Sequence, residues 1–336
     1  MALRPAPSIT PARRGLRLAL ALAIALAALW ASLRGVSLPR LRHVLEDLSI
    51  PLFLAVGLGT VVVNLIKSFK LGVLLKPTAR VGFRTLFGAE TISILTDVLF
   101  PFRLLELVKG LVVSRSSGLP VALVMGAQVV EKAIEFSVLL FLCVLGTFCF
   151  PLPPWLAPGR WMGLAVLVLL MLFILFCRHR LQGAPSTTRR WSVLARVQVL
   201  LSQLTEGMRS ASVSPTALLK VLLMTVVEWC LFGILVWLTG QALGLNLGPV
   251  AVIGFLIANA LAFAFPASSA GSVGIYEFIG AETLALLADV PREEAFALAL
   301  SIHVLLIVFG ALSGIIGLQL VGLNLTQLRG MSGRKE

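Results

Sequence analysis

Charged residues are scarce in this 336-residue chain: Asp, Glu, Lys and Arg make up 13% of it, whereas apolar residues make up 58%. The mean hydropathy of +1.00 exceeds what the core of a soluble protein can bury, which excludes the soluble globular and disordered classes. The four cysteines have no CxxC spacing and no neighbouring histidine, so neither a disulfide framework nor a metal site is indicated. The composition predicts an all-α polytopic membrane protein.

Acidic residues are fewer still: 15 Asp and Glu stand against 28 Lys and Arg, a formal net charge of +13. Such an excess of positive charge would also suit a protein that binds nucleic acid. However, the basic residues lie in short clusters between apolar runs, as in membrane proteins that mark their cytoplasmic loops. We therefore expect no nucleic-acid partner and a location in the cell (inner) membrane.

About six stretches are long and apolar enough to cross a bilayer, which takes about 20 residues. The first of them also fits a cleaved signal peptide, because arginines precede its apolar run, so its retention stays open. Most basic residues fall on one side if the N-terminus is inside, which predicts that both termini are cytoplasmic. Lys67, Arg103, Lys109 and Lys132 are expected within the membrane instead. The stretches are 15–33, 51–73, 119–150, 159–177, 216–243 and 292–322.

Two further apolar regions are broken near the middle. Pro101 interrupts 84–115, and Pro266 with its glycines interrupts 249–290. The first region starts and ends inside and the second starts and ends outside, so each is predicted to be a re-entrant helix pair. Entry from opposite faces is typical of an inverted repeat with a site near the bilayer midplane. The alternative stays open that 249–290 forms two full spans and 84–115 a surface hairpin.

The chain is predicted to form a single integral membrane domain over 1–336. Its first half is 15–150 and its second half is 216–322. A cytoplasmic basic segment, 178–215, joins the halves and is expected to include an amphipathic helix on the inner surface, and 323–336 is a short cytoplasmic tail.

Several charges lie where an ordinary membrane helix would have none. In LFPFRLLELVKG (99–110), Arg103, Glu106 and Lys109 follow the Phe-Pro at every third position. Each unpaired charge at the bilayer centre costs about 2.5 to 3.5 kcal/mol, so these side chains must face protein or water. Arg103 and Lys109 are the better candidates for an anionic ligand, because a guanidinium or ammonium group binds phosphate.

The next apolar helix has a polar face. Gln128, Glu131 and Glu135 are spaced by three and four residues, so they share one side of a helix that must point into the protein. Lys132 stands three residues before Glu135. An internal ion pair and a polar groove facing 103–109 are both open interpretations.

The second break lies in AFPASSAGSVGIYEF (264–278), which is rich in small residues. A helix beginning near Gly274 would direct its amide groups at an anion, whereas small side chains also serve close helix packing, and both interpretations stay open. His303, alone in an apolar helix, is expected to be a hydrogen-bonded packing residue.

Three segments resemble motifs of the lysylphosphatidylglycerol synthase transmembrane, or flippase-like, family. FPFRLLELVKG resembles P-x-R-x-x-E-x-x-[RK], VVEKAIE (129–135) resembles V-x-E-[RK]-x-x-[DE], and FPASSAGSVGIYE resembles P-x-S-x-G-G-x-G-x-x-E. The resemblance covers nearly the whole chain in order and spacing. The chain departs from the family at Leu104-Leu105, where a small residue is common, at Lys109 and Lys132, which replace Arg, and at Ala270-Gly271, which replaces Gly-Gly.

The resemblance implies a stand-alone membrane domain that moves or handles amphipathic lipids, such as phospholipids, polyprenyl-linked sugars or hopanoid-type lipids. It implies substrate-binding roles, by motif position, for Arg103, Glu106, Lys109, Glu131, Lys132, Glu135, Pro266, Gly271, Gly274 and Glu277.

Three functions remain open. The paired breaks and internal charges favour a lipid translocase. A lipid-modifying enzyme is disfavoured, because no nucleophile, metal cluster, nucleotide-binding loop or soluble catalytic domain accompanies the carboxylates, and we expect no catalytic residue, metal or cofactor. The third is a non-transporting protein that binds a lipid or recruits a membrane-associated lipid-modifying enzyme, such as a glycosyltransferase, through 178–220. Homo-oligomerisation is compatible with all three.

Overall fold

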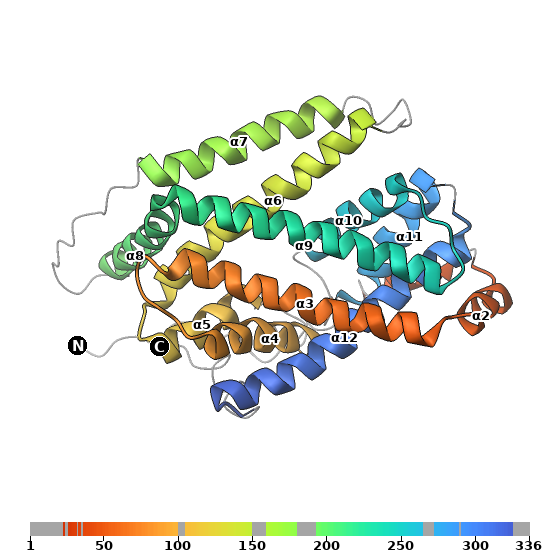
Figure 1. Cartoon of the computed structure of the whole chain (residues 1–336), viewed down its shortest axis with the longest axis horizontal. Helices are drawn as coiled ribbons and strands as arrows, with labels where there is room; N and C mark the ends of the chain where they lie inside the picture. The colour runs from red at the N-terminus through yellow and green to blue at the C-terminus, as the bar shows by residue number, and fades with distance from the viewer. Residues whose placement is uncertain are drawn as a thin grey trace.

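The computed structural model describes residues 36–99, 105–149, 159–179, 193–264, 272–288 and 290–324, with a few positions between 23 and 34. These ranges fold into α-helices, most of which run along the long axis of the molecule (Figure 1). The all-α prediction is therefore confirmed for the described residues.

Three helices are long and apolar enough to cross a membrane: α3 (Ile50–Leu75), α9 (Pro215–Ala242) and α12 (Arg292–Val321). They have 26, 28 and 30 residues, or about 40 Å at a rise of about 1.5 Å per residue. Two more helices follow the same axis, α6 (Val121–Cys149) and α7 (Gly159–His179). All five lie within a few residues of predicted spans, and most of the predicted span 15–33 lies outside the described residues.

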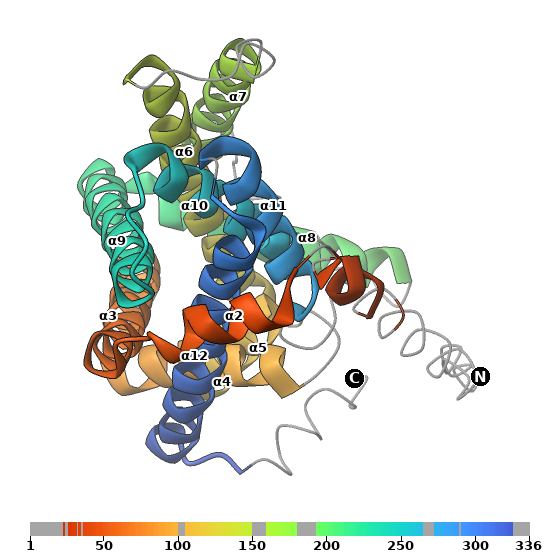
Figure 2. The same ribbon diagram turned by 90° about the vertical axis from the view of Figure 1, so that its right-hand side faces the viewer.

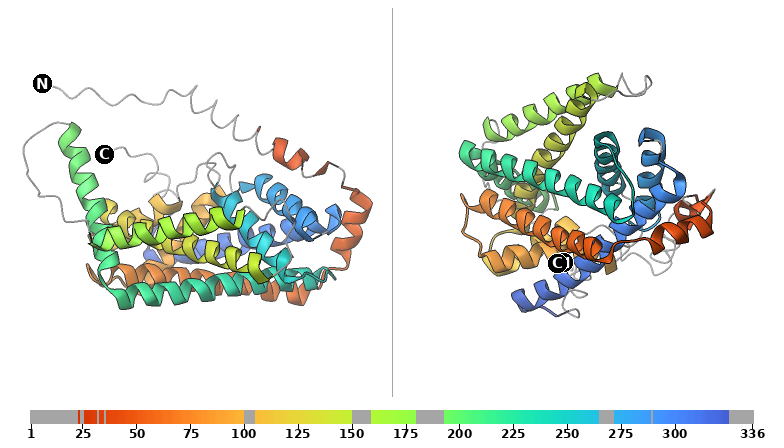
Figure 3. Two further views of the ribbon diagram at one scale, coloured as in Figure 1. Left: turned by 90° about the horizontal axis from the view of Figure 1, so that it is seen from above. Right: turned by 45° about the vertical axis from the view of Figure 1, so that its right-hand side comes forward.

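Two shorter helices mark the ends of the bundle. α2 (Leu38–Glu46) lies at one end and α8 (Val193–Val213) at the other, and we call these the α2 end and the α8 end (Figures 1 and 3). At the α2 end, the Ser49 amide donates to the Ala242 carbonyl at 2.8 Å and the Ser37 amide donates to Glu293 at 3.1 Å. The first bond joins the start of α3 to the end of α9, and the second joins the start of α2 to the start of α12.

Both regions predicted to be broken are divided into two short helices. The first contains α4 (Phe83–Leu99) and α5 (Leu105–Ser117), and the second contains α10 (Pro249–Ala264) and α11 (Ile275–Ala288). The prolines themselves lie outside the described residues. The α4–α5 pair lies toward the α8 end and the α10–α11 pair toward the α2 end (Figures 1 and 3). With 16 and 14 residues, α10 and α11 are too short for the alternative prediction of two full spans.

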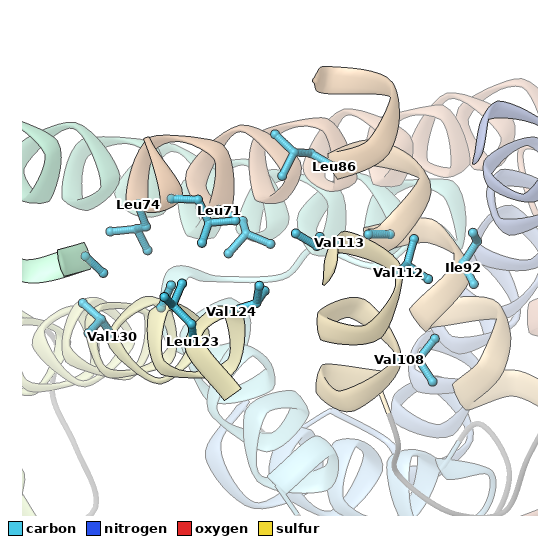
Figure 4. Close-up of a cluster of buried hydrophobic side chains, with 14 of the residues drawn as sticks. Leu71, Leu74, Leu86, Ile92, Val108, Val112, Val113, Leu123, Val124 and Val130 are labelled. Atoms are coloured by element: carbon cyan, nitrogen blue, oxygen red, sulfur yellow. The ribbon is translucent and has the colours of Figure 1, made fainter. Parts of the chain in front are cut away.

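The α4–α5 pair is part of the core. Ile92 of α4 and Val112 and Val113 of α5 are fully buried, and they pack with leucines of α3 and with α6 (Figure 4). The alternative prediction of a surface hairpin over 84–115 is therefore wrong. Burial of branched apolar side chains on several helices at once is what holds this pair inside the bundle.

α12 passes through the middle of the bundle and contacts both pairs (Figure 2). From the α8 end, α4 packs along α12 through glycines, so that Gly310 faces Ile94 and Gly317 faces Gly88. From the α2 end, Glu277 near the start of α11 contacts His303 at 2.6 Å. His303 and Gly310 are only two turns apart, about 10 Å. The inner ends of both pairs thus reach nearly the same level of α12.

The α4–α12 contact predicts a sensitive position at Gly314. A Cβ there would overlap the Leu95 Cβ and lie 2.8 Å from the Thr91 carbonyl oxygen, and backbone cannot move aside as a flexible side chain can. Gly314→Ala is expected to destabilise the protein by about 1 to 3 kcal/mol, measured as a lower thermal midpoint in detergent. Gly82→Ala is the control, because a Cβ at Gly82 meets nothing within 4 Å. Equal midpoints for the two variants would contradict the close packing.

Candidate functional site

Charged side chains from five helices meet in the interior. We call this group the charged cluster. It reaches from the last turns of α3 to the middle of α9. Its members are Lys67 and Lys70 of α3, Glu90 of α4, Glu106 and Lys109 of α5, Glu131, Lys132 and Glu135 of α6, and Glu228 of α9.

One branch of the cluster centres on Lys109. Its Nζ lies 2.7 Å from Glu90 Oε2 and 3.3 Å from Glu131 Oε2. Lys109 is 2% exposed and Glu131 is fully buried, so neither contacts solvent. Lys109 was predicted to bind an anionic ligand, but here its charge is already compensated by two carboxylates. Lys109 of α5 therefore meets the acidic face of α6, an approach that the sequence left open.

A second branch centres on Lys70, which is fully buried. Its Nζ lies 2.5 Å from Glu135 Oε1 and 2.5 Å from Glu228 Oε2, which joins α3 to α6 and α9. Lys67 lies 3.8 Å from the other oxygen of Glu228 and is 30% exposed. Two carboxylates around one buried ammonium make Lys70 the main electrostatic tie between these helices.

Lys132 and Glu106 form the accessible edge of the cluster. Lys132 Nζ lies 2.7 Å from Glu135 Oε2, which is the internal ion pair that the sequence left open, and 3.2 Å from Glu106 Oε1. The side chains of Lys132 and Glu106 are 35% and 34% exposed. A charged ligand therefore meets Lys132 before any other lysine of α5 or α6 in the described residues.

Gln128 fixes the start of α5. With its amide nitrogen toward Glu106, Gln128 donates to the Glu106 carbonyl at 2.9 Å and to Glu106 Oε2 at 3.1 Å, and its oxygen accepts from the Gly110 amide at 3.2 Å. Glu106 and Gly110 are one turn apart, so the hydrogen bonds of the Gln128 side chain span a full turn of α5. This contact holds Glu106 at the accessible edge.

Sequence reasoning missed four members of the cluster as site residues: Lys67, Lys70, Glu90 and Glu228. Lys70 lies near the end of the predicted span 51–73, and the structure buries its side chain between two glutamates. The available signal was the spacing of three between Lys67 and Lys70 on an apolar helix, which puts both on one face. Arg103 lies outside the described residues.

A second buried group surrounds the start of α11. Glu277 Oε1 lies 2.6 Å from His303 Nδ1, and the Gly274 amide donates to Glu277 Oε2 at 2.7 Å. The Tyr276 ring stacks on the His303 imidazole at 4.3 Å, and Asn259 donates to the Tyr276 hydroxyl at 2.6 Å. The prediction of a hydrogen-bonded packing role for His303 is confirmed.

The same geometry changes the interpretation of Gly274. Its amide was predicted to face an anionic ligand, but Glu277 supplies the anion from within the chain. Gly274 has a φ of +88°, a left-handed conformation that glycine adopts without strain, and this conformation brings its amide to the carboxylate. Pro266 and Gly271, also predicted to bind substrate, lie outside the described residues.

Comparison with known protein families shows to which of them the chain is similar. The family model described as the lysylphosphatidylglycerol synthase TM region matches residues 18–314. No curated protein and no solved structure matches the chain. The matched residues include the whole charged cluster and the group around Glu277.

Proposed function

Because the chain belongs to the lysylphosphatidylglycerol synthase transmembrane family, it is an integral multi-pass membrane protein, and we propose that it moves an amphipathic lipid across the cell membrane. The lipid class stays broad: a phospholipid, a polyprenyl-linked sugar or a hopanoid-type lipid each has a polar head and an apolar tail.

The proposed topology has the α8 end in the cytoplasm, with both termini there. α3, α6, α7, α9 and α12, with residues 15–33, are the spans. The α4–α5 and α10–α11 pairs then enter from opposite faces as an inverted repeat. In such transporters, broken helices face a polar site near the midplane, where backbone freed by the break is satisfied by protein or by a water-filled cavity.

The observation that carries the proposal is the convergence of the two pairs on α12. The inner ends of the pairs meet α12 at positions about 10 Å apart, near its middle. Each pair would enter from one face and end near the middle of α12. Movement of one pair at a time would open the midplane to one side and then the other, with the charged cluster beside the first pair.

The test is lipid transfer in vesicles. Purified protein is reconstituted with a lipid whose head group carries a fluorophore, and an impermeant reductant bleaches the label in the outer leaflet. We expect the protected fraction to fall below that of empty vesicles as inner-leaflet lipid is moved outward. If no plausible lipid moves faster than in empty vesicles, the proposal is wrong.

Lys132 provides a residue-level prediction in the same assay. As the most exposed lysine of the charged cluster it is expected to contact an anionic head group, so Lys132→Gln should slow transfer about tenfold, the effect of losing one charge-assisted hydrogen bond. Lys76→Gln is the matched control, because Lys76 is exposed at the end of α3 and is no member of the cluster. Equal slowing by both substitutions would indicate a surface-charge effect instead.

A non-transporting protein is the second candidate, and the surface of α8 favours it. α8 packs on α6 through glycine, while Val199, Leu200 and Leu201 on it are at least half exposed. This apolar surface suits the inner leaflet or a membrane-associated enzyme. If lipid transfer survives replacement of these three residues by Ser while binding of the enzyme is lost, α8 serves recruitment and not transport.

A further inference from the structure

We propose that Glu131 is a proton-binding site, and that its protonation loosens the attachment of the α4–α5 pair to α6 and so couples lipid movement to protons. This inference rests on the proposed function, since it concerns the motion that would carry the lipid. It starts from one atom of the charged cluster.

That atom is Glu131 Oε1, which is buried and has no hydrogen-bond partner among the described residues. Glu131 Oε2 has a single ion-pair contact, Lys109 at 3.3 Å, and Lys109 is closer to Glu90 at 2.7 Å. A buried carboxylate without compensating bonds is costly, and a carboxyl group in that position gains by becoming neutral. Glu131 is therefore the weakest-held anion of the cluster.

The other lysines of the cluster form ion pairs with carboxylates other than Glu131. Lys70 on α3 lies between Glu135 and Glu228, Lys67 on α3 pairs with Glu228, and Lys132 on α6 pairs with Glu135 and Glu106. Five carboxylates thus share four ammonium groups among the described members of the cluster. The unequal count leaves a place for one proton, and the pairing pattern puts it on Glu131.

A proton fits this position better than a larger cation does. Glu131 is fully buried, and an ammonium head group would have to displace neighbouring side chains to reach Oε1. A proton needs no such space. In the step itself a hydronium ion transfers its proton to Glu131: one O–H bond breaks in the hydronium, one O–H bond forms on Glu131, a water molecule is left, and the cluster gains one positive charge.

The consequence for the helices follows from the partners of Lys109. When Glu131 is neutral, Lys109 keeps its ion pair with Glu90, which belongs to the same helix pair. The α4–α5 pair therefore stays intact while its buried ion pair to α6 is weakened. The remaining polar contacts to α6 are the partly exposed Glu106–Lys132 pair and the Gln128 hydrogen bonds, beside the apolar packing of the two helices. Protonation would favour displacement of the pair as one unit.

The first experiment needs no transport. Infrared difference spectra of the whole protein in lipid are recorded between high and low pH, to find the C=O stretch of protonated carboxyl groups. We expect a band that grows as the pH is lowered and is absent in Glu131→Gln but present in Glu282→Gln, whose carboxylate is partly exposed and paired with Arg292. A spectrum with no band lost in Glu131→Gln would overturn the proton site, as would a band that responds to an amine-headed lipid and not to pH.

The second experiment tests the coupling. In vesicles with a gradient of one pH unit, the wild type should change the ratio of labelled lipid between leaflets by about tenfold for one proton per lipid, and Glu131→Gln should leave the ratio unchanged. A wild type that moves lipid with no response to the gradient would overturn the coupling. If the wild type moves no lipid, the proposed function fails while the infrared result still decides whether Glu131 binds a proton.

Discussion

Lys70→Met is expected to cause the largest loss of stability of any single substitution in the charged cluster. The substitution leaves Glu135 and Glu228, each 2.5 Å from Lys70 Nζ, as uncompensated buried charges on two different helices. Breaking a buried ion pair by removing one partner typically costs about 3 to 5 kcal/mol, because the remaining charge keeps its desolvation penalty. The measurement is the thermal midpoint of the purified protein in detergent, with expression level in membranes as a second readout.

Two comparisons separate charge from packing in that result. Lys67→Met removes a cation that is 30% exposed and 3.8 Å from its partner, so its midpoint should lie close to that of the wild type. Adding Glu135→Gln and Glu228→Gln to Lys70→Met should recover part of the loss, since neutral amides replace the unpaired carboxylates. If the triple variant is no more stable than Lys70→Met, the loss comes from the side-chain volume and not from the charge.

Gly207→Ala is expected to have the next largest effect, because it separates α8 from α6. A Cβ at Gly207 would overlap the Leu123 carbonyl oxygen and lie 3.0 Å from the Leu123 Cα, and Gly126 on α6 faces Gly207 in the same way. Every atom in the way belongs to the backbone, so relief requires one helix to move. We expect a loss of about 3 kcal/mol, at the upper end for overpacking.

The readout for Gly207→Ala is protease cleavage of the chain near α8 together with the thermal midpoint. Gly248→Ala is the control, since a Cβ at Gly248 meets nothing within 4 Å. Separation of α8 should raise the cleavage rate at a temperature where the rest of the bundle stays folded. A Gly207 variant that is cleaved no faster than the control would show that α8 tolerates a wider helix spacing.

The helices and their breaks could be predicted from the sequence, because both are local properties. A run of about 20 apolar residues defines a span, and Pro101 and Pro266 interrupt a helix wherever it lies. The same holds for the face shared by Gln128, Glu131 and Glu135, which depends only on helix periodicity. These predictions needed no knowledge of which helix packs against which.

The pairing of the charges could be predicted only in part. The Lys132–Glu135 pair lies within one helix and was expected, whereas Lys70 meets Glu135 and Glu228 across three helices. The rule that basic residues collect on the cytoplasmic side concerns orientation, and it does not say which side chains a lysine such as Lys70 meets. Only the packing of α3 against α6 and α9 shows that this lysine is buried.

The contacts of the group around Glu277 also could not be predicted from the sequence. Glu277 and His303 were each noted as single polar residues in apolar helices, and their 2.6 Å contact joins positions 26 residues apart. Likewise, the prediction of a free helix N-terminus at Gly274 could not include the Glu277 carboxylate folding back three residues to fill it. Local patterns identify polar residues that need a partner, but the partner depends on the tertiary fold.

The charged cluster also constrains how the protein is synthesised and inserted. Lys70 enters the membrane with α3, but Glu135 follows it by 65 residues and Glu228 comes later still. During translation, Lys70 is therefore inserted before either of the glutamates that neutralise its charge. Lys67 and Lys70 stand in the last turns of α3, where a long side chain can extend to the interfacial water until then. A nascent chain that stops before α9 therefore has an incomplete cluster, and quality-control proteases should recognise this intermediate. Release from the insertion machinery as a stable protein is expected only after α9 has been inserted.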